Sequence, residues 1–328
     1  MKLTEITEKE YADISSNTIS KLAYSSSVES IVKAFTCALN SPQRPFGEYH
    51  LIKKDADTAI LSYTKGIYTK EDITQFSTEL ESHSSIDWKN MYRGTEIGIF
   101  LTELISIHYK KNKWNRLKED ILSCIEKKDD KKKNNRYTLI LQKNGLDISS
   151  LGFELNGAEI FIIGDIGTRC GHSMTKGKIT VSGNTGSYLG YHLYGGEIIV
   201  EGDASEHVGE KMCAGTIHVL GNANQNIGEY MFGGKIIVKG NCGRSVGYCM
   251  NNGEIHIFGN ADGHVGSQML NGKITIEGTC GPSVGELMKR GVIHIKNNSG
   301  QECADPNNRE ARVIVNGEEF RTTREEYK

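Results

Sequence analysis

Apolar and polar residues alternate in short runs that recur along the second half of the chain. Each run opens at a glycine or an alanine, with Ile at its third position and Ile or Val at its fifth, as in GKITVSG, GEIIVEG and GKIIVKG. The third position recurs every nineteen residues, at Ile160, Ile179, Ile198, Ile217, Ile236, Ile255, Ile274 and Ile293. A period of two is typical of a half-buried strand. The pattern predicts eight repeat units, beginning at Ala158, with one short strand in each.

Two further positions of the unit are apolar. A residue such as Leu189, Val208 or Ile227 precedes a glycine in most units, and we expect a second strand-like segment there. Six of the eight methionines occupy the position three residues after that glycine. A helix would have to accommodate glycine at three fixed positions per unit, each at a cost of about 1 kcal/mol relative to Ala. A β-solenoid is predicted instead, in which each unit is one coil and the apolar columns fill the interior.

The distribution of glycine and charge supports this prediction. Of the 37 glycines, 28 lie between Gly164 and Gly291, where they are expected to form the corners of the coils. The second residue of each unit is predicted to point outward, and its charge changes sign over much of the column. The members are Glu159, Lys178, Glu197, Thr216, Lys235, Glu254 and Lys273. Alternating charge favours this register of coil stacking over a slipped one.

The unit G-x-I-x-V-x-G-(x)5-V-G-x-x-M, with GNTGSYLG and GNCGRSVG at its centre, resembles the GXGXG β-helix family. That family includes the C-terminal domain of the glutamate synthase large subunit and one of the subunits of formylmethanofuran dehydrogenase. The resemblance covers residues 155–297. It implies a right-handed, single-stranded parallel β-helix that organises neighbouring catalytic domains or subunits and carries no catalytic residue. It also implies protein partners among amidotransferase or oxidoreductase subunits, and we expect no cofactor and no metal.

The first half of the chain is a different kind of sequence. Residues 1–135 are predicted to form an α+β domain, mostly helical, with a helix near Thr69 and a buried helix over Ile97–Ile107. Two short strands are predicted at Tyr49–Ile52 and Ala59–Tyr63, on either side of a turn in KKDADT.

A run of charged residues at 126–136 predicts an exposed linker between two domains. The second domain then spans residues 137–328. Its end carries the hairpin signal Asn316-Gly317, which is expected to cap the solenoid.

Composition excludes several functions. The net charge of −2 provides no overall positive potential to attract a phosphate backbone, so nucleic acid is not an expected partner. The eight cysteines never form C-x-x-C, which excludes zinc-ribbon and ferredoxin ligand sets. The chain begins without an apolar segment, and its longest apolar stretch is shorter than the roughly 20 residues of a membrane helix. We expect a cytoplasmic protein that contacts no membrane and has reduced thiols.

Two serines and two cysteines have a simpler explanation than catalysis or cross-linking. Ser245 and Ser283 lie in G-x-S-x-G motifs, but other coils carry Tyr, His or Asn at that phase, so the repeat explains the spacing. Cys242 and Cys280 share a column two coils apart, too far for a disulfide, and are predicted to fill space.

Three histidines are predicted to be solvated. His218, His256 and His294 share an outward column but occur on every second coil, about 9.6 Å apart, which is too far for one metal ion to join two of them.

An aromatic group is the strongest candidate for a binding surface. Tyr188, Tyr191 and Tyr194 recur at three-residue steps, and Phe232 lies on the column of Tyr194. Aromatic residues with polar tips are enriched in interface cores, so these four residues are expected to bind a protein partner. Ordinary stacking of aromatic side chains on the solenoid wall explains them equally well.

Two functions are therefore compared, and the sequence leaves open whether the protein is an enzyme. The first is a non-catalytic scaffold or assembly module. The second is a hydrolase or transferase with its active site in residues 1–135, where Cys37 with His50 or His108 is the candidate thiol pair and the β-helix is a rigid platform. A glycan-binding solenoid is disfavoured, because the coils lack recurrent clusters of exposed Asp.

Overall fold

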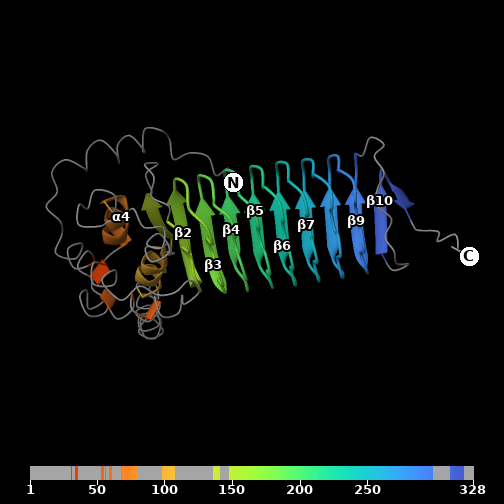
Figure 1. Cartoon of the computed structure of the whole chain (residues 1–328). Coiled ribbons are helices and arrows are strands. Elements are labelled where there is room, and N and C mark those ends of the chain that lie inside the picture. The colour runs from red at the N-terminus through yellow and green to blue at the C-terminus, as the bar shows by residue number, and fades with distance from the viewer. Residues whose placement is uncertain are drawn as a thin grey trace, which may run out of the picture.

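A parallel β-solenoid forms the main body of the structure (Figure 1). The computed structural model describes residues 31, 34–35, 53–54, 56, 59–60, 68, 70–79, 98–107, 136–140, 148–297 and 311–320. Eleven strands form one sheet in sequence order. They are β1 (Arg136–Ile140), β2 (Asn156–Ile163), β3 (Lys176–Val181), β4 (Glu197–Val200), β5 (Thr216–Val219), β6 (Lys235–Val238), β7 (Glu254–Ile257), β8 (Lys273–Ile276), β9 (Gly291–Ile295), β10 (Ala311–Val315) and β11 (Glu318–Phe320).

The predicted inward columns form the core. In β6, Ile236 and Val238 are fully buried, whereas Lys235 is exposed and Ile237 half-buried. Three further columns are also buried: a column of mostly small residues that includes Ala223, Cys242 and Ala261, the residue before the glycine, and the methionine position. Fully burying one Ile or Met contributes about 1.5–3 kcal/mol. Repetition of these positions produces one continuous core along the solenoid.

The predicted register of the outer charges is confirmed. Lys178 pairs with Glu197 in the sheet and their side chains lie 2.8 Å apart. Lys235 and Glu254 are likewise paired, at 3.4 Å.

The predicted second strand is wrong. Each coil from β2 to β9 contains one strand, and the segment around the apolar–glycine pair is a turn. In the coil that begins with β6, Ser245 and Cys249 lie in the left-handed region, with φ values of 62° and 51°. Gly247 lies between them at φ 71°, and a Cβ atom there would lie 2.4 Å from Cδ1 of Ile274. The chain therefore turns tightly against the isoleucine column, which an extended strand would not do.

A row of Asn and Asp side chains connects successive coils on the outside. Each Oδ1 accepts a hydrogen bond, 2.6–2.9 Å long, from a backbone N–H one coil later. The members are Asp165, Asn184, Asp203, Asn222, Asn241 and Asn260. The residue before most members of this row is glycine, because the side chain of the previous coil lies too close for a Cβ atom. A Cβ on Gly240, just before Asn241, would lie 2.5 Å from Oδ1 of Asn222. The sequence analysis missed this ladder.

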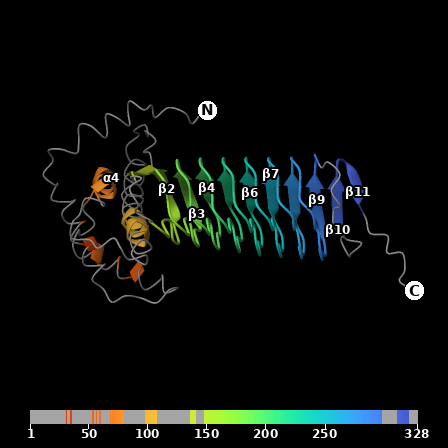
Figure 2. The ribbon, with the colours of Figure 1, turned by 45° about the horizontal axis from the view of Figure 1, so that its top comes forward.

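Helices cover the N-terminal end of the solenoid (Figures 1 and 2). Thr74 in α4 (Lys70–Glu79) donates a 2.7 Å hydrogen bond to the carbonyl of Thr138 in β1. The helix over residues 98–107, which is buried from 98 to 105, packs on the first coil, where Thr102 Oγ1 accepts the N–H of Gly152 at 2.7 Å. The predicted helices near Thr69 and over Ile97–Ile107 are thus confirmed. None of the helices described is long and apolar enough to cross a membrane.

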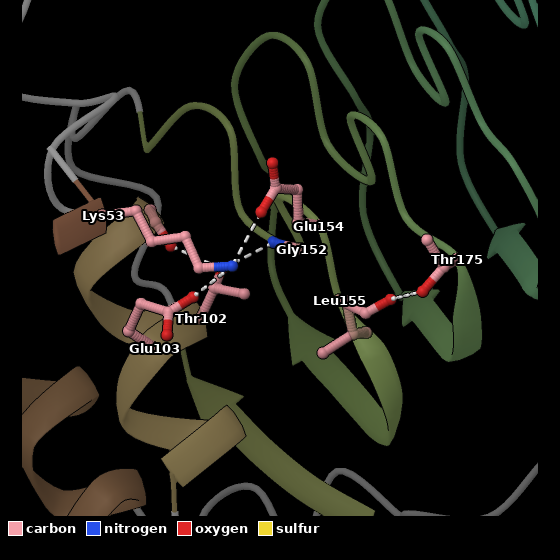
Figure 3. A network of polar contacts seen from close by, with 8 residues as sticks. Lys53, Thr102, Glu103, Gly152, Glu154, Leu155 and Thr175 are labelled. Carbon is pink, nitrogen blue, oxygen red and sulfur yellow. Dashed lines mark hydrogen bonds and ion pairs between the residues drawn. The ribbon is translucent and has the colours of Figure 1, made fainter. Parts of the chain in front are cut away.

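A partly buried group of three charged side chains lies at this junction (Figure 3). Lys53 Nζ lies 2.8 Å from Glu154 on the solenoid and 3.3 Å from Glu103, which is almost fully buried in the helix over residues 98–107. Burial lowers the pKa of Lys53, but the contacts with the two carboxylates outweigh it, and the pKa is raised. The ammonium group therefore stays charged and connects the helices to the solenoid.

The predicted strand at Ala59–Tyr63 and the turn before it are wrong. Lys53, Lys54, Ala56, Ala59 and Ile60 are all helical. Ala56, Ala59 and Ile60 are buried at the i, i+3 and i+4 spacing of a helix face, which explains the difference. The predicted strand at 49–52 and the linker residues 126–135 lie outside the described residues, so the division near residue 136 stays a prediction.

The C-terminal hairpin is confirmed. β10 extends the sheet parallel to β9, and β11 returns antiparallel to β10. Asn316 and Gly317 connect them with φ values of 52° and 85°, as a two-residue hairpin turn requires. The hairpin adds two strands beyond the last coil.

A matched pair of substitutions tests which face of β6 is inside. Ile236→Thr places a hydroxyl in a dry core and should lower the free energy of unfolding by about 2–3 kcal/mol. Ile237→Thr makes the same change at an outward position, where β3 and β8 already carry Thr180 and Thr275, and should cost less than about 0.5 kcal/mol. Chemical denaturation measures both. Equal losses would show that the inward face is misassigned.

Candidate functional site

Aromatic and ionisable side chains cluster on the turns that follow β2, β3, β4 and β5. Two neighbouring columns supply most of them. The first contains Arg169, Tyr188, His207 and Asn226, all with left-handed φ values of 59–64°. The second contains His172, Tyr191, Glu210 and Glu229. The repeat thus places side chains that are far apart in sequence next to one another.

Tyr188 and Tyr191 are packed into the wall of the solenoid. The Tyr188 ring stacks on the His207 ring, with centroids 4.7 Å apart and planes 6° apart, and meets the Tyr191 ring edge-on at 5.8 Å. The hydroxyl of Tyr191 accepts a 3.2 Å hydrogen bond from Lys211 Nζ. Both tyrosines are half-buried.

His172 is the most strongly perturbed histidine of this cluster. Its ring packs between those of Phe153 and Tyr191, at 5.0 and 5.1 Å. Burial, with smaller contributions from Arg169 and His192, lowers the pKa of His172 to about 4. The ring is therefore neutral at physiological pH.

His207 faces two carboxylates. Its Nδ1 lies 3.1 Å from Oε2 of Glu210 and 2.9 Å from Oε2 of Glu229. Burial raises the pKa of Glu229, and the neighbouring Glu210 acts in the same direction, whereas His207 and Lys211 oppose the rise. Lys211 Nζ lies 3.3 Å from the other oxygen of Glu210. The sequence analysis missed this group, although the nineteen-residue spacing of Glu210 and Glu229 was a visible signal.

An exposed apolar strip runs beside the cluster. Tyr194 and Phe232 are each 51% exposed, and Phe232 lines a groove of about 540 Å³ with Tyr230, Leu270 and Leu287. Leu270 lies on the column of Tyr194 and Phe232, so the period pointed to it as well. Of the four residues predicted to bind a partner, Tyr194 and Phe232 are therefore accessible, whereas Tyr188 and Tyr191 are not fully so.

The two G-x-S-x-G serines do not lie on the strand-to-helix turn that a catalytic serine of this motif requires. Ser245 and Ser283, at φ 62° and 65°, occupy the same turn position as His207, and each is followed by a further turn instead of a helix. The coil explains both motifs, as expected.

The spacing of the outward histidine column is as expected, but its three histidines are half-buried. In the sheet register, Ile237 separates His218 from His256, and Thr275 separates His256 from His294. His256 Nε2 instead lies 2.6 Å from Glu277.

Two of the described thiols are made unreactive by burial. Burial raises the pKa of Cys170 and Cys242 to about 12. Cys242 and Cys280 are buried in the small-residue column with Ala223 and Ala261, which confirms that they fill space. The candidate pair of Cys37 with His50 or His108 lies outside the described residues.

Comparisons with known proteins give a partial match. No family model matches the chain, and no curated protein sequence matches it. A matching solved chain belongs to the formyltransferase/hydrolase complex of Methylorubrum extorquens, solved in complex with methylofuran. The sequences are 24% identical, the match covers 50% of this chain and 57% of that chain, and the TM-score is 0.37. This chain thus spans less than two thirds of that chain, and its function has to be inferred from its own residues.

The burial of His172 predicts a loss of stability in acid. The unfolded chain takes up this proton near pH 6.5, whereas the folded chain takes it up only near pH 4. Because the unfolded state binds more protons between these values, the His172 contribution is complete above pH 6.5 and declines as the pH falls towards 4.

Denaturation at pH 7 and pH 4.5 measures this effect. His172→Phe keeps a ring in place and should remove about 2 kcal/mol of the difference in stability between the two pH values. His264→Phe, at a more exposed position, is the control. An unchanged pH dependence in His172→Phe would contradict the assignment.

Proposed function

We propose that the protein is a non-catalytic scaffold that holds a protein partner on the exposed apolar strip of its solenoid. The observation that carries the proposal is the strip itself. Its members are Tyr194, Tyr230, Phe232, Leu270 and Leu287, each between 37% and 52% exposed. Large apolar side chains gathered along one surface are typical of a binding site.

The form of the solenoid supports this function. Successive coils are joined by strand pairing and by the Asn and Asp ladder, so residues on one column keep a fixed separation. Tyr194 and Phe232 lie two coils apart on one column, and Leu270 lies two coils further on. A partner would therefore meet a preorganised row of anchors, which lowers the entropic cost of binding.

The charged columns on the strand face are poorly suited to tight binding. Lys178 and Glu197 neutralise one another, as do Lys235 and Glu254, and exposed pairs of this kind contribute about 0–1 kcal/mol. Aromatic residues concentrate binding energy more strongly. The strip is accordingly the better candidate surface.

The sequence resemblance extends the proposal to the class of partner. A GXGXG β-helix would organise catalytic subunits of an amidotransferase or oxidoreductase system. The partner proposed is therefore such a subunit, located with this chain in the cytoplasm.

Two substitutions on the strip test the proposal. Tyr194→Ala combined with Phe232→Ala should weaken partner binding by upwards of about 2 kcal/mol, because it removes the two most exposed aromatic rings of the strip. The full chain, tagged in its native cell, identifies the partner by mass spectrometry of co-purified proteins. A titration of that partner against each variant then gives the affinity.

Phe258→Ala is the matched control. Phe258 is also an exposed ring, 40% accessible, but it stacks on His256 at the end of a strand and lies outside the groove. It should leave the affinity unchanged. Full affinity in the double variant would move the docking site away from the strip.

A further inference from the structure

Three side chains of the kind that binds metal ions converge from two neighbouring coils. His207 and Glu210 belong to the coil that begins with β4, and Glu229 to the coil that begins with β5. One ligand atom from each lies within 4.8 Å of the other two. Nitrogen and oxygen ligands about 2.1 Å from one ion are separated by roughly 3–4 Å, depending on the angle between them. The observed distances of 3.1 and 2.9 Å from Nδ1 to the two carboxylates are close to this range.

Two carboxylates face one imidazole at this point, with Lys211 beside the other oxygen of Glu210. Glu210 and Glu229 occupy the same position in successive coils, and their side chains are only 12% and 16% exposed. Two carboxylates so close together repel one another when water is largely excluded. A protonated His207 has only one hydrogen on Nδ1, so it can serve only one of them at a time.

Two buried atoms of the group meet in poor alignment. Nδ1 of His207 and Oε2 of Glu229 are shielded from solvent and lie 2.9 Å apart, but in a geometry that gives neither a well-aligned hydrogen bond. Buried polar atoms are normally satisfied. An ion shared by the two atoms would satisfy both at once.

The surrounding side chains are suited to holding a ligand histidine. Tyr188 stacks on the imidazole and fixes the plane of the ring. Nε2 lies 3.4 Å from the side-chain amide of Asn226. With the Asn226 amide turned by half a rotation, its oxygen accepts the Nε2–H, which leaves the lone pair of Nδ1 for a metal. Lys211 neutralises the outer oxygen of Glu210, at 3.3 Å.

We propose that His207, Glu210 and Glu229 bind one divalent transition-metal ion, which joins two coils of the solenoid next to Tyr188. One imidazole and two carboxylates suit Zn²⁺ and ions of similar size such as Co²⁺. The site is separate from the proposed docking groove, because none of its three residues lines that groove.

The test uses the full chain, freed of metal with a chelator and then titrated with Zn²⁺ by calorimetry. Glu229→Gln keeps the shape of the side chain and removes the charge. It should weaken Zn²⁺ binding by at least about tenfold, a loss that even a supporting residue of a metal site can cause. Co²⁺ should give visible absorption bands with the natural protein that are absent from the variant.

The same repeat supplies a matched control. His264 and Glu286 are the counterparts of His207 and Glu229 three coils later, with Nδ1 and Oε2 3.4 Å apart, but Ser267 replaces Glu210. Glu286→Gln should therefore leave Zn²⁺ affinity unchanged. Equal losses in the two variants, or no Zn²⁺ binding by the natural protein, would overturn the proposal.

The stability of the metal-free protein distinguishes a metal site from a group held together only by ion pairs. If the group binds metal, metal-free Glu229→Gln should be at least as stable as the natural protein, because one of two repelling charges is removed. Added Zn²⁺ should then raise the melting temperature of the natural protein alone. A metal-free variant that is clearly less stable, and a natural protein that does not respond to Zn²⁺, would show that the three residues form only an ion pair.

Discussion

The stacking of coils of equal length is the constraint on which the solenoid depends. Backbone hydrogen bonds run from each coil to its neighbour, as from Gly247 N–H to Ile227 O at 2.7 Å, and the same pattern recurs at nearly every phase. A coil with one residue more or fewer would break these bonds and turn inward side chains outward. Equal length in turn places like residues on like residues, so apolar positions become columns of core and Asn or Asp positions become a ladder.

The same constraint explains where function can lie. Positions that fill the interior or turn the chain have little freedom to vary, and they repeat. The outward positions of the turns vary from coil to coil, with Tyr191, Glu210 and Tyr248 on one column and Tyr194, Phe232 and Leu270 on another. Both candidate surfaces, the apolar strip and the group around His207, lie at these variable positions. The rigid stack holds their side chains at fixed separations.

Much of the solenoid could be predicted from the sequence, because a single period fixes both the strand and the face that is buried. The prediction of a second strand failed because an apolar residue before glycine fits a left-handed turn as well as a strand, as at Val246 and Gly247. β1 was missed because Arg136 pairs with Glu159, which breaks the period. The His207 group was missed for another reason: the period shows which residues share a column, but not which columns adjoin.

Removing one whole coil tests the stacking constraint most directly. Deletion of residues 235–253, nineteen residues from β6 to the start of β7, joins two equivalent positions of the repeat. The account predicts a shorter solenoid that folds, keeps its β-sheet circular dichroism and unfolds cooperatively. Deletion of residues 235–244, about half a coil, should abolish that cooperative unfolding. Equal tolerance of both deletions, or equal loss of folding in both, would contradict the claim that the nineteen-residue coil is the unit of this structure.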